Sequence, residues 1–158
     1  MRPLDRQRHL TRRIQIVPFR LRHLERILWI ERASFGKQAW PRALFLELYR
    51  DWPELFLAAK LGGRIAGYLA ASTEKRTAEI VSLAVHPQYR RSGVADALLR
   101  HVLHKLRKAG LRRVELMVRP GNIAAQELYG GFGFREGRLA RRYYEDGGDG
   151  LQMTRALQ

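Results

Sequence analysis

The sequence predicts an α/β (α+β) fold in which a mixed sheet of about seven strands is flanked by about four helices. Apolar runs rich in β-branched residues alternate with segments whose apolar residues recur at helical spacing. Glycine and proline separate most of these segments. Residues 80–106 read as a buried strand, a short basic loop and a helix. A right-handed crossover through this helix makes the strand before it and the strand after it parallel neighbours.

The first half of the chain holds two strands of a hairpin and the segments that lead into it. Gly62-Gly63 is a glycine pair typical of a hairpin turn. Pro41 opens a helix, because proline is favoured in the first helical turn. The expected elements are a strand at 14–17, helices at 21–31 and from Pro41, and strands at 55–61 and 64–72.

The second half alternates strands and helices. Its first strand, 77–85, contains the run Ile80–Val85, which is expected to be buried on both faces. Gly110 closes the following helix and Asn122 caps the next one. The remaining expected elements are helices at 93–109 and from Asn122, and strands at 114–118, 134–140 and 151–157.

Length and composition limit the possible classes of protein. A chain of 158 residues predicts one domain, 14–158, preceded by a basic flexible tail at 1–13. The absence of cysteine excludes disulfides, thiolate metal sites and a cysteinyl acyl-enzyme. No apolar run reaches transmembrane length, no histidine pair suggests a metal, and a cytoplasmic location is expected. The net charge of +15 favours anionic partners such as coenzyme A phosphates, RNA or acidic surfaces.

The loop between the strand at 77–85 and the helix at 93–109 has the features of a phosphate site. Arg90, Arg91, Ser92 and Gly93 precede the helix directly. Successive backbone N–H groups at a helix start bind phosphate, and a glycine allows close approach. The spacing matches neither the nucleotide-triphosphate loop nor the dinucleotide fingerprint. The alternative is an ordinary surface turn with solvated arginines.

Four stretches together resemble the GNAT N-acetyltransferases, most closely the bacterial ribosomal-protein alanine N-acetyltransferases. They are Leu-Ala-Val-His-Pro-Gln-Tyr-Arg-Arg-Ser-Gly-Val-Ala from Leu83, Val-Arg-Pro-Gly-Asn-Ile-Ala-Ala-Gln-Glu-Leu-Tyr from Val118, Gly-Phe-Gly-Phe from Gly131, and Arg-Arg-Tyr-Tyr from Arg141. The resemblance covers roughly residues 14 to 157. It implies a GNAT fold with parallel strands that splay apart, acetyl-coenzyme A as the acetyl donor, and direct attack by an amine in a ternary complex.

The resemblance also implies roles for individual residues. Asn122 is expected at the pantetheine end of the donor, although capping its helix alone would explain it. Tyr129 matches the tyrosine that protonates the departing thiolate, and the alternative is a packed core tyrosine. The other implied positions are Leu83, Ala84 and Val85 along the pantetheine, Arg90, Arg91, Ser92, Gly93, Val94 and Ala95 around the pyrophosphate, and Tyr143, Tyr144, Met117 and Glu115 on the acceptor side.

The sequence departs from the resemblance at the general base. The alanine N-acetyltransferases carry a glutamate at the position of Met117, and a thioether is no useful proton acceptor. Glu79 is the expected replacement, because related GNAT enzymes use a glutamate at this strand position. Glu115, or water alone, is the alternative base. Glu79 could instead be an edge carboxylate paired with a surface arginine.

We therefore expect an acyltransferase that acetylates the α-amine of a protein N-terminus, such as that of a ribosomal protein. An α-amine with a pKa of about 7.7–8.0 asks less of a base than a lysine of about 10.4. One alternative is a GNAT enzyme with a lysine or small-molecule acceptor, which Met117 favours. The other is a basic ribosome- or RNA-associated module, favoured by the N-terminal charge.

Overall fold

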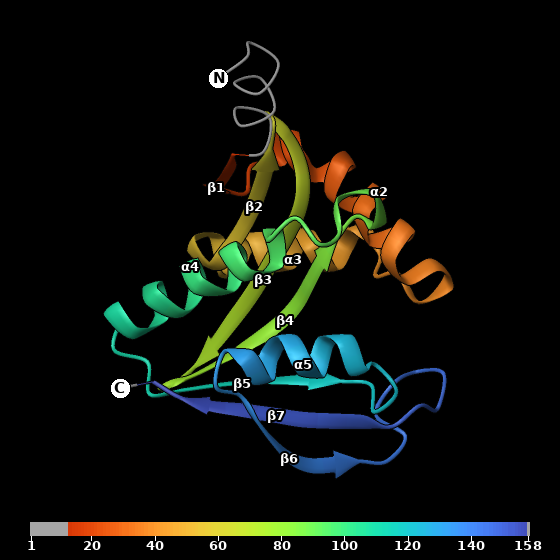
Figure 1. The fold of residues 1–158 in the computed structure, drawn as a ribbon, viewed down its shortest axis with the longest axis vertical. Helices are drawn as coiled ribbons and strands as arrows, with labels where there is room; N and C mark the ends of the chain where they lie inside the picture. The colour runs from red at the N-terminus through yellow and green to blue at the C-terminus, as the bar shows by residue number, and fades with distance from the viewer. Residues whose placement is uncertain (1–12, 158) are drawn as a thin grey trace, which may run out of the picture. The chain divides into compact units, whose positions relative to one another are not determined.

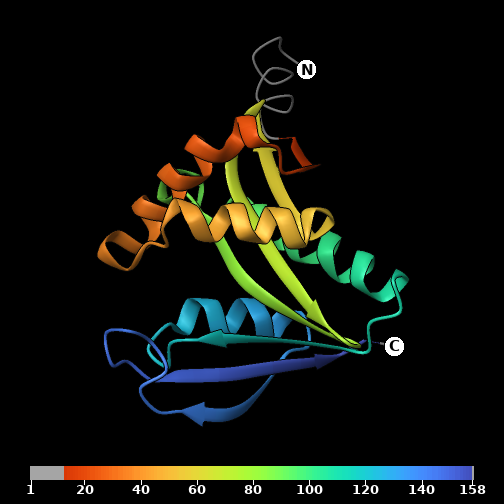
Figure 2. The same ribbon diagram turned by 180° about the vertical axis from the view of Figure 1, so that it is seen from behind.

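The computed structural model describes residues 13–157, which form a seven-stranded mixed sheet in the order β1-β2-β3-β4-β5-β7-β6 (Figures 1 and 2). β4 and β5 are parallel, whereas β5, β7 and β6 are antiparallel. Residues 1–12, which hold most of the predicted basic tail, lie outside the described residues. The strands are β1 (Ile14–Pro18), β2 (Phe56–Leu61), β3 (Arg64–Glu74), β4 (Thr77–Val85), β5 (Arg113–Val118), β6 (Arg135–Ala140) and β7 (Gly150–Ala156), and the helices are α2 (Leu24–Phe35), α3 (Arg42–Asp51), α4 (Val94–Lys108) and α5 (Ile123–Gly131).

These elements confirm the predicted fold class and order. Residues 13–157 also contain four single-turn 3₁₀ helices that the sequence does not predict, because a segment of three residues is too short to show a hydrophobic period. They are Leu21–His23, Gly36–Gln38, Pro53–Leu55 and Pro87–Tyr89.

The prediction that β4 is buried on both faces is wrong for one face. Ala78, Ile80, Ser82 and Ala84 are buried, whereas the residues between them are only half-buried. Successive side chains of a strand point to opposite faces, so the half-buried residues share one face. That face carries Glu79 as well as Leu83 and Val85.

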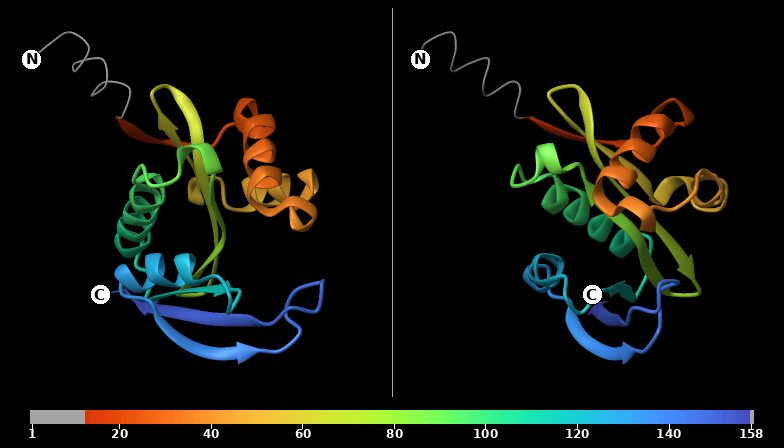
Figure 3. Two further views of the ribbon diagram at one scale, coloured as in Figure 1. Left: turned by 45° about the vertical axis from the view of Figure 1, so that its right-hand side comes forward. Right: turned by 90° about the vertical axis from the view of Figure 1, so that its right-hand side faces the viewer.

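The chain contacts divide the protein into two compact units, and the expectation of a single domain at 14–158 stays a prediction. Among the described residues, the first unit contains 13–72 together with 82–102. In it, α2 and α3 lie on one side of β2 and β3, and the first turns of α4 lie on the other (Figure 3). An aromatic cluster fills the core: Phe19 stacks on Phe56 at 4.0 Å between ring centroids, and Phe45 meets Tyr68 edge to face.

A buried carboxylate links several elements of the first unit. Glu31 on α2 is 2% exposed and accepts hydrogen bonds from the Trp40 N–H (3.1 Å) and from the Tyr68 hydroxyl. The Tyr68 hydroxyl also lies 2.8 Å from the Ser82 hydroxyl on β4. Burial raises the pKa of Glu31, and these hydrogen bonds oppose that rise. The network fixes α2 and the chain before α3 against β3 and β4.

Among the described residues, the second unit contains 73–81 and 103–157. Its strands β5, β7 and β6 lie side by side, and α5 runs alongside β5 (Figures 1 and 3). β4 joins β5 through three parallel pairs, which end at Glu79 opposite Glu115. The predicted cap of α5 is confirmed, because the Asn122 side chain accepts a hydrogen bond from the Ala125 N–H at 3.1 Å.

Candidate active site

The loop between β4 and α4 has the backbone geometry of an anion site. β4 ends at Val85 and Pro87 starts a single 3₁₀ turn, after which Arg91 (φ 60°) and Gly93 (φ 84°) adopt left-handed conformations. At the loop's start, the His86 ring stacks on Trp29 of α2, with 3.7 Å between centroids and 7° between planes. The stacking fixes the start of a short loop that leads into a helix.

Six consecutive backbone N–H groups of this loop, from Arg91 to Asp96, find no protein acceptor among residues 13–157. The Ser92 hydroxyl turns inward and donates to the Tyr89 carbonyl. Free N–H groups at a helix start carry partial positive charge and favour an anionic ligand.

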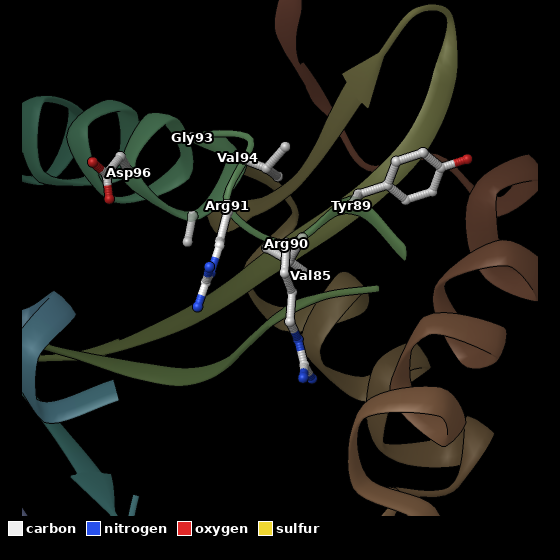
Figure 4. A pocket seen from close by; sticks show the side chains of 8 residues that line it. Val85, Tyr89, Arg90, Arg91, Gly93, Val94 and Asp96 are labelled. Carbon is white, nitrogen blue, oxygen red and sulfur yellow. The ribbon is translucent and has the colours of Figure 1, made fainter. Parts of the chain in front are cut away.

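A hollow of about 300 Å³ opens at this loop (Figure 4). The exposed side chains of Arg90 and Arg91 extend from the loop on the same side. Neither forms an ion pair with a carboxylate of the described chain. The residues that line the hollow are Val85, Tyr89, Arg90, Arg91, Gly93, Val94, Ala95 and Asp96. Six of the predicted donor-site residues are among them, whereas Leu83, Ala84, Ser92, Asn122 and Tyr129 are not.

Two carboxylates lie side by side in the second unit. Glu79 and Glu115 are register partners of β4 and β5, so they share a face of the sheet. Glu115 lies 3.7 Å from the Arg113 guanidinium and accepts a hydrogen bond of 3.4 Å from Gln152. The Glu79 carboxylate has no hydrogen bond or ion pair with any residue of the described chain, so the alternative of an arginine-paired Glu79 is not found there.

The electrostatics of Glu79 follow from this isolation. Burial raises the pKa of the Glu79 carboxyl above its usual value, and the neighbouring Glu115 raises it further. A half-buried carboxylate beside a second carboxylate is stabilised most by a nearby cation or by binding a proton. An amine that arrives as ammonium and gives up a proton supplies both.

The loop between β6 and β7, residues 141–149, is held in place by Arg119 at the end of β5. Its guanidinium pairs with Asp146 (3.1 Å) and lies 4.0 Å from the centre of the Tyr144 ring. The Tyr144 N–H donates to the Gly148 carbonyl at 3.0 Å. The predicted Tyr143-Tyr144 hairpin is therefore confirmed as a hairpin, and its acceptor role stays a prediction.

Tyr143 lies on the Met117 side of this loop and is 48% exposed. A Cβ added to Gly150 of β7 would come within 2.8 Å of Met117 Cε and 2.9 Å of the Tyr143 ring. Gly150 thus leaves room for an apolar pair at the surface of the second unit. Burial raises the pKa of Tyr143, and the charge of Glu79 raises it further.

Tyr129 of α5 is almost fully buried, and its ring meets Phe134 edge to face at 5.6 Å. Burial raises the pKa of Tyr129 well above its usual value. The hydroxyl therefore keeps its proton near neutral pH, as a proton donor must. The contact with Phe134 is equally what a packing role would give.

Sequence reasoning missed several residues of these two groups. Tyr89 and Asp96 line the hollow, and Arg119 with Asp146 holds the 141–149 loop. The turn-forming run Gly147–Gly150 was a usable signal for a structured loop, but nothing local indicates which arginine pairs with Asp146. Among residues 13–157 there is no cluster of three potential metal ligands, and no helix is long and apolar enough to cross a membrane.

Comparison with known proteins identifies the fold. A sequence model of the acetyltransferase (GNAT) family matches residues 21–134. The protein belongs to the GNAT acetyltransferase family. An N-alpha-acetyltransferase of Sulfurisphaera tokodaii is 30% identical over 151 residues, covering 87% of this chain and 90% of that protein.

Two solved structures extend the comparison to the whole GNAT fold. Ard1 of Thermoplasma volcanium superposes with a TM-score of 0.87 at 30% identity, covering 92% of this chain and 98% of that one. The ribosomal-protein-S18-alanine N-acetyltransferase of Escherichia coli gives a TM-score of 0.82 at 27% identity, covering 92% and 95%. The family assignment makes the protein an acyltransferase, as the sequence analysis predicted.

Proposed function

We propose that this GNAT enzyme transfers the acetyl group of acetyl-coenzyme A to the α-amine of a protein N-terminus. The observation that carries the proposal is Glu79, a half-buried carboxylate that has no cationic partner among residues 13–157, in a chain with 30 basic and 15 acidic residues. The N-alpha and ribosomal-protein acetyltransferases among its relatives support this acceptor class.

The residues of the β4–α4 loop fit the donor substrate. The six N–H groups that have no acceptor among residues 13–157, with Arg90 and Arg91 beside them, suit the diphosphate of coenzyme A. Leu83, Ala84 and Val85 would bind the pantetheine arm, and Asn122 would reach its end. Bound there, the donor supplies an acetyl thioester whose carbonyl carbon is open to attack.

In the proposed reaction, Glu79 accepts a proton from the acceptor ammonium through an ordered water. The neutral amine then forms its bond to the thioester carbon as the carbon–sulfur bond breaks, and Tyr129 gives its proton to the departing sulfur. The second proton leaves the nitrogen as the amide forms and returns to the Tyr129 oxygen through solvent. Tyr143, Tyr144 and Met117, with Glu115, would line the acceptor side. Ribosome proximity through the basic surface and a cytoplasmic location stay predictions.

A second acceptor class, lysine or a small amine, is favoured by Met117, which replaces the carboxylate of the alanine N-acetyltransferases. Mass spectrometry after incubation with acetyl-coenzyme A separates the two. The substrates are a lysine-free peptide beginning with Ala, and the same peptide with a blocked N-terminus and one lysine. We expect an acetyl gain on the first only. A gain confined to the second would contradict the α-amine proposal.

The base is tested by the pH–rate profile of Glu79→Gln beside the wild type. The raised pKa of Glu79 means that the wild-type carboxylate is protonated, and loses its use as a base, at a higher pH than an ordinary glutamate. The variant should lose rate mainly at low pH, and the loss should shrink as pH rises through the acceptor's own pKa of about 7.7–8.0. In the Glu79→Gln variant, the further substitution Met117→Glu should restore part of the lost activity.

Glu115→Gln is the matched control, because Glu115 occupies the partner position on β5 and already has Arg113 and Gln152 as partners. A defect in Glu115→Gln with Glu79→Gln intact would transfer the role to Glu115. Wild-type profiles for both variants would leave water as the base.

A further inference from the structure

β3 contains a bulge next to the start of the β4–α4 loop. Ala59 of β2 pairs with Gly67, and the next residue, Lys60, pairs with Ile65. One extra residue, Ala66, therefore stands on β3 between these two pairs. A bulge of this kind bends its strand and locally increases the twist.

The bulge contacts the end of β4 directly. The extra residue, Ala66, accepts a hydrogen bond at its carbonyl oxygen from the His86 N–H at 2.9 Å. His86 is the first residue after β4, where the chain enters the loop that lines the hollow of Figure 4. The bulge thus sets where the loop begins.

Gly67, the next residue of the bulge, leaves space that its neighbours occupy. A Cβ there would lie 2.8 Å from the Ala84 carbonyl oxygen, 3.0 Å from Val94 Cγ1 and 3.2 Å from Val85 Cγ2. Ala84 meets it through backbone, which cannot rotate away as a flexible side chain can. Val85 and Val94 both line the hollow. Gly67 does not have a positive φ, so only this close approach requires glycine.

We propose that Gly67 is a positioning residue for the acetyl-coenzyme A site. Its missing side chain lets the end of β4 and the first residue of α4 close over β3. That closure holds Val85 and Val94 in place and aims the loop's N–H groups at the diphosphate. The inference rests on the proposed function, because it assigns Gly67 to the donor half of that site.

Gly67→Ala tests the proposal by adding only a methyl group. Calorimetry should show the Kd for acetyl-coenzyme A raised about tenfold or more, because a displacement of the loop weakens several N–H contacts together. The KM for the donor should rise in parallel, while kcat at saturating donor stays near the wild-type value. A merely structural role would lower the melting temperature without this split between KM and kcat.

Gly63→Ala is the matched control. Gly63 lies in the β2–β3 turn with φ 81° and no atom within 4 Å of an added Cβ, so alanine there is strained but touches nothing. It should destabilise the fold and leave the donor Kd unchanged. Equal Kd shifts in Gly63→Ala and Gly67→Ala would overturn the proposal, as would a wild-type Kd in folded Gly67→Ala.

A double variant keeps the test open if Gly67→Ala does not fold. Val94→Ala removes the Cγ1 atom 3.0 Å from the added methyl, so Gly67→Ala should raise the Kd less in the Val94→Ala background than in the wild type. The added methyl still lies 2.8 Å from the Ala84 carbonyl oxygen in this background, so part of the effect should remain. If the single variant cannot be measured, a double variant that binds like Val94→Ala therefore overturns the proposal, and a weaker one supports it. A wild-type protein that binds no acetyl-coenzyme A would instead refute the proposed function.

Discussion

Gly93→Ala tests the loop where the structure makes its strongest conformational demand. Gly93 has φ 84°, and an added Cβ would meet only Ile14 Cδ1, at an ordinary 3.6 Å. The protein itself therefore has room for a methyl group. The cost comes from the backbone, because an L-residue in a left-handed conformation loses roughly 1–2 kcal/mol. Relief of that strain turns the N–H groups of the loop away from the ligand.

Gly93→Ala should lower both the melting temperature and the stabilisation that bound acetyl-coenzyme A provides. For a chain of this size, 1 kcal/mol corresponds to about 2–4 °C in Tm, so the strain predicts a loss of about 2–8 °C. At a donor concentration of 100 times Kd, binding stabilises the wild type by about 2.7 kcal/mol. A tenfold weaker variant gains only about 1.4 kcal/mol at the same concentration. Thermal melts with and without acetyl-coenzyme A measure both quantities.

Gly110→Ala separates strain from binding. Gly110 follows α4 with φ 85°, matching Gly93 before the helix, and no atom lies within 4 Å of an added Cβ. Both variants should lose similar stability without ligand, and only Gly93→Ala should lose the ligand-induced gain. Gly93→Val, with a branched side chain at the same φ, should lose binding altogether. A full ligand-induced gain in folded Gly93→Ala would refute the assignment of this loop to the diphosphate.

Two further variants test the second unit. Tyr129→Phe removes the proposed proton donor, so stopped assays should show a rate about 10²–10⁴-fold lower with the donor Kd kept, and an unchanged rate would make Tyr129 a packing residue. Arg119→Ala removes both the ion pair to Asp146 and the cation over Tyr144, so the 141–149 loop should loosen and the acceptor KM should rise severalfold while the donor Kd holds. Arg50→Ala, which breaks an exposed pair with Asp51, is the control for removing an arginine, and an equal KM change there would contradict the role of Arg119.

The order of elements could be predicted because each long segment carries its own period. The apolar residues of α4 recur at helical spacing, and Gly62-Gly63 marks the hairpin between β2 and β3. The faces of β4 could not be predicted the same way. A run such as Ile80–Val85 has no polar residue except Ser82 to mark its inner side, and Ser82 proves to be the buried one, satisfied by the Tyr68 hydroxyl.

Part of the candidate site could likewise be predicted from the sequence, and part could not. The Arg90–Ala95 loop was predictable because all its groups are consecutive, and a helix start supplies its N–H groups whatever surrounds it. The contributions of Gly67, Arg119 and Glu31 were not, because each depends on a partner more than eight residues away in the chain. A glycine within an apolar strand was the one local signal, and it indicates a bulge or a close approach without saying what approaches.

The replacement of the family carboxylate by Met117 also has a consequence for Glu79. A glutamate at position 117 would share a strand face with Glu115, two residues away, and Glu115 already lies opposite Glu79. Three carboxylates on neighbouring strands would raise one another's pKa values, and some would be protonated when a base is needed. With methionine there, Cε packs near Gly150 and Tyr143, and Arg113 and Gln152 engage Glu115. Glu79 is then left as the carboxylate of this face that has no partner within the described chain, which is the state a base requires before its substrate arrives.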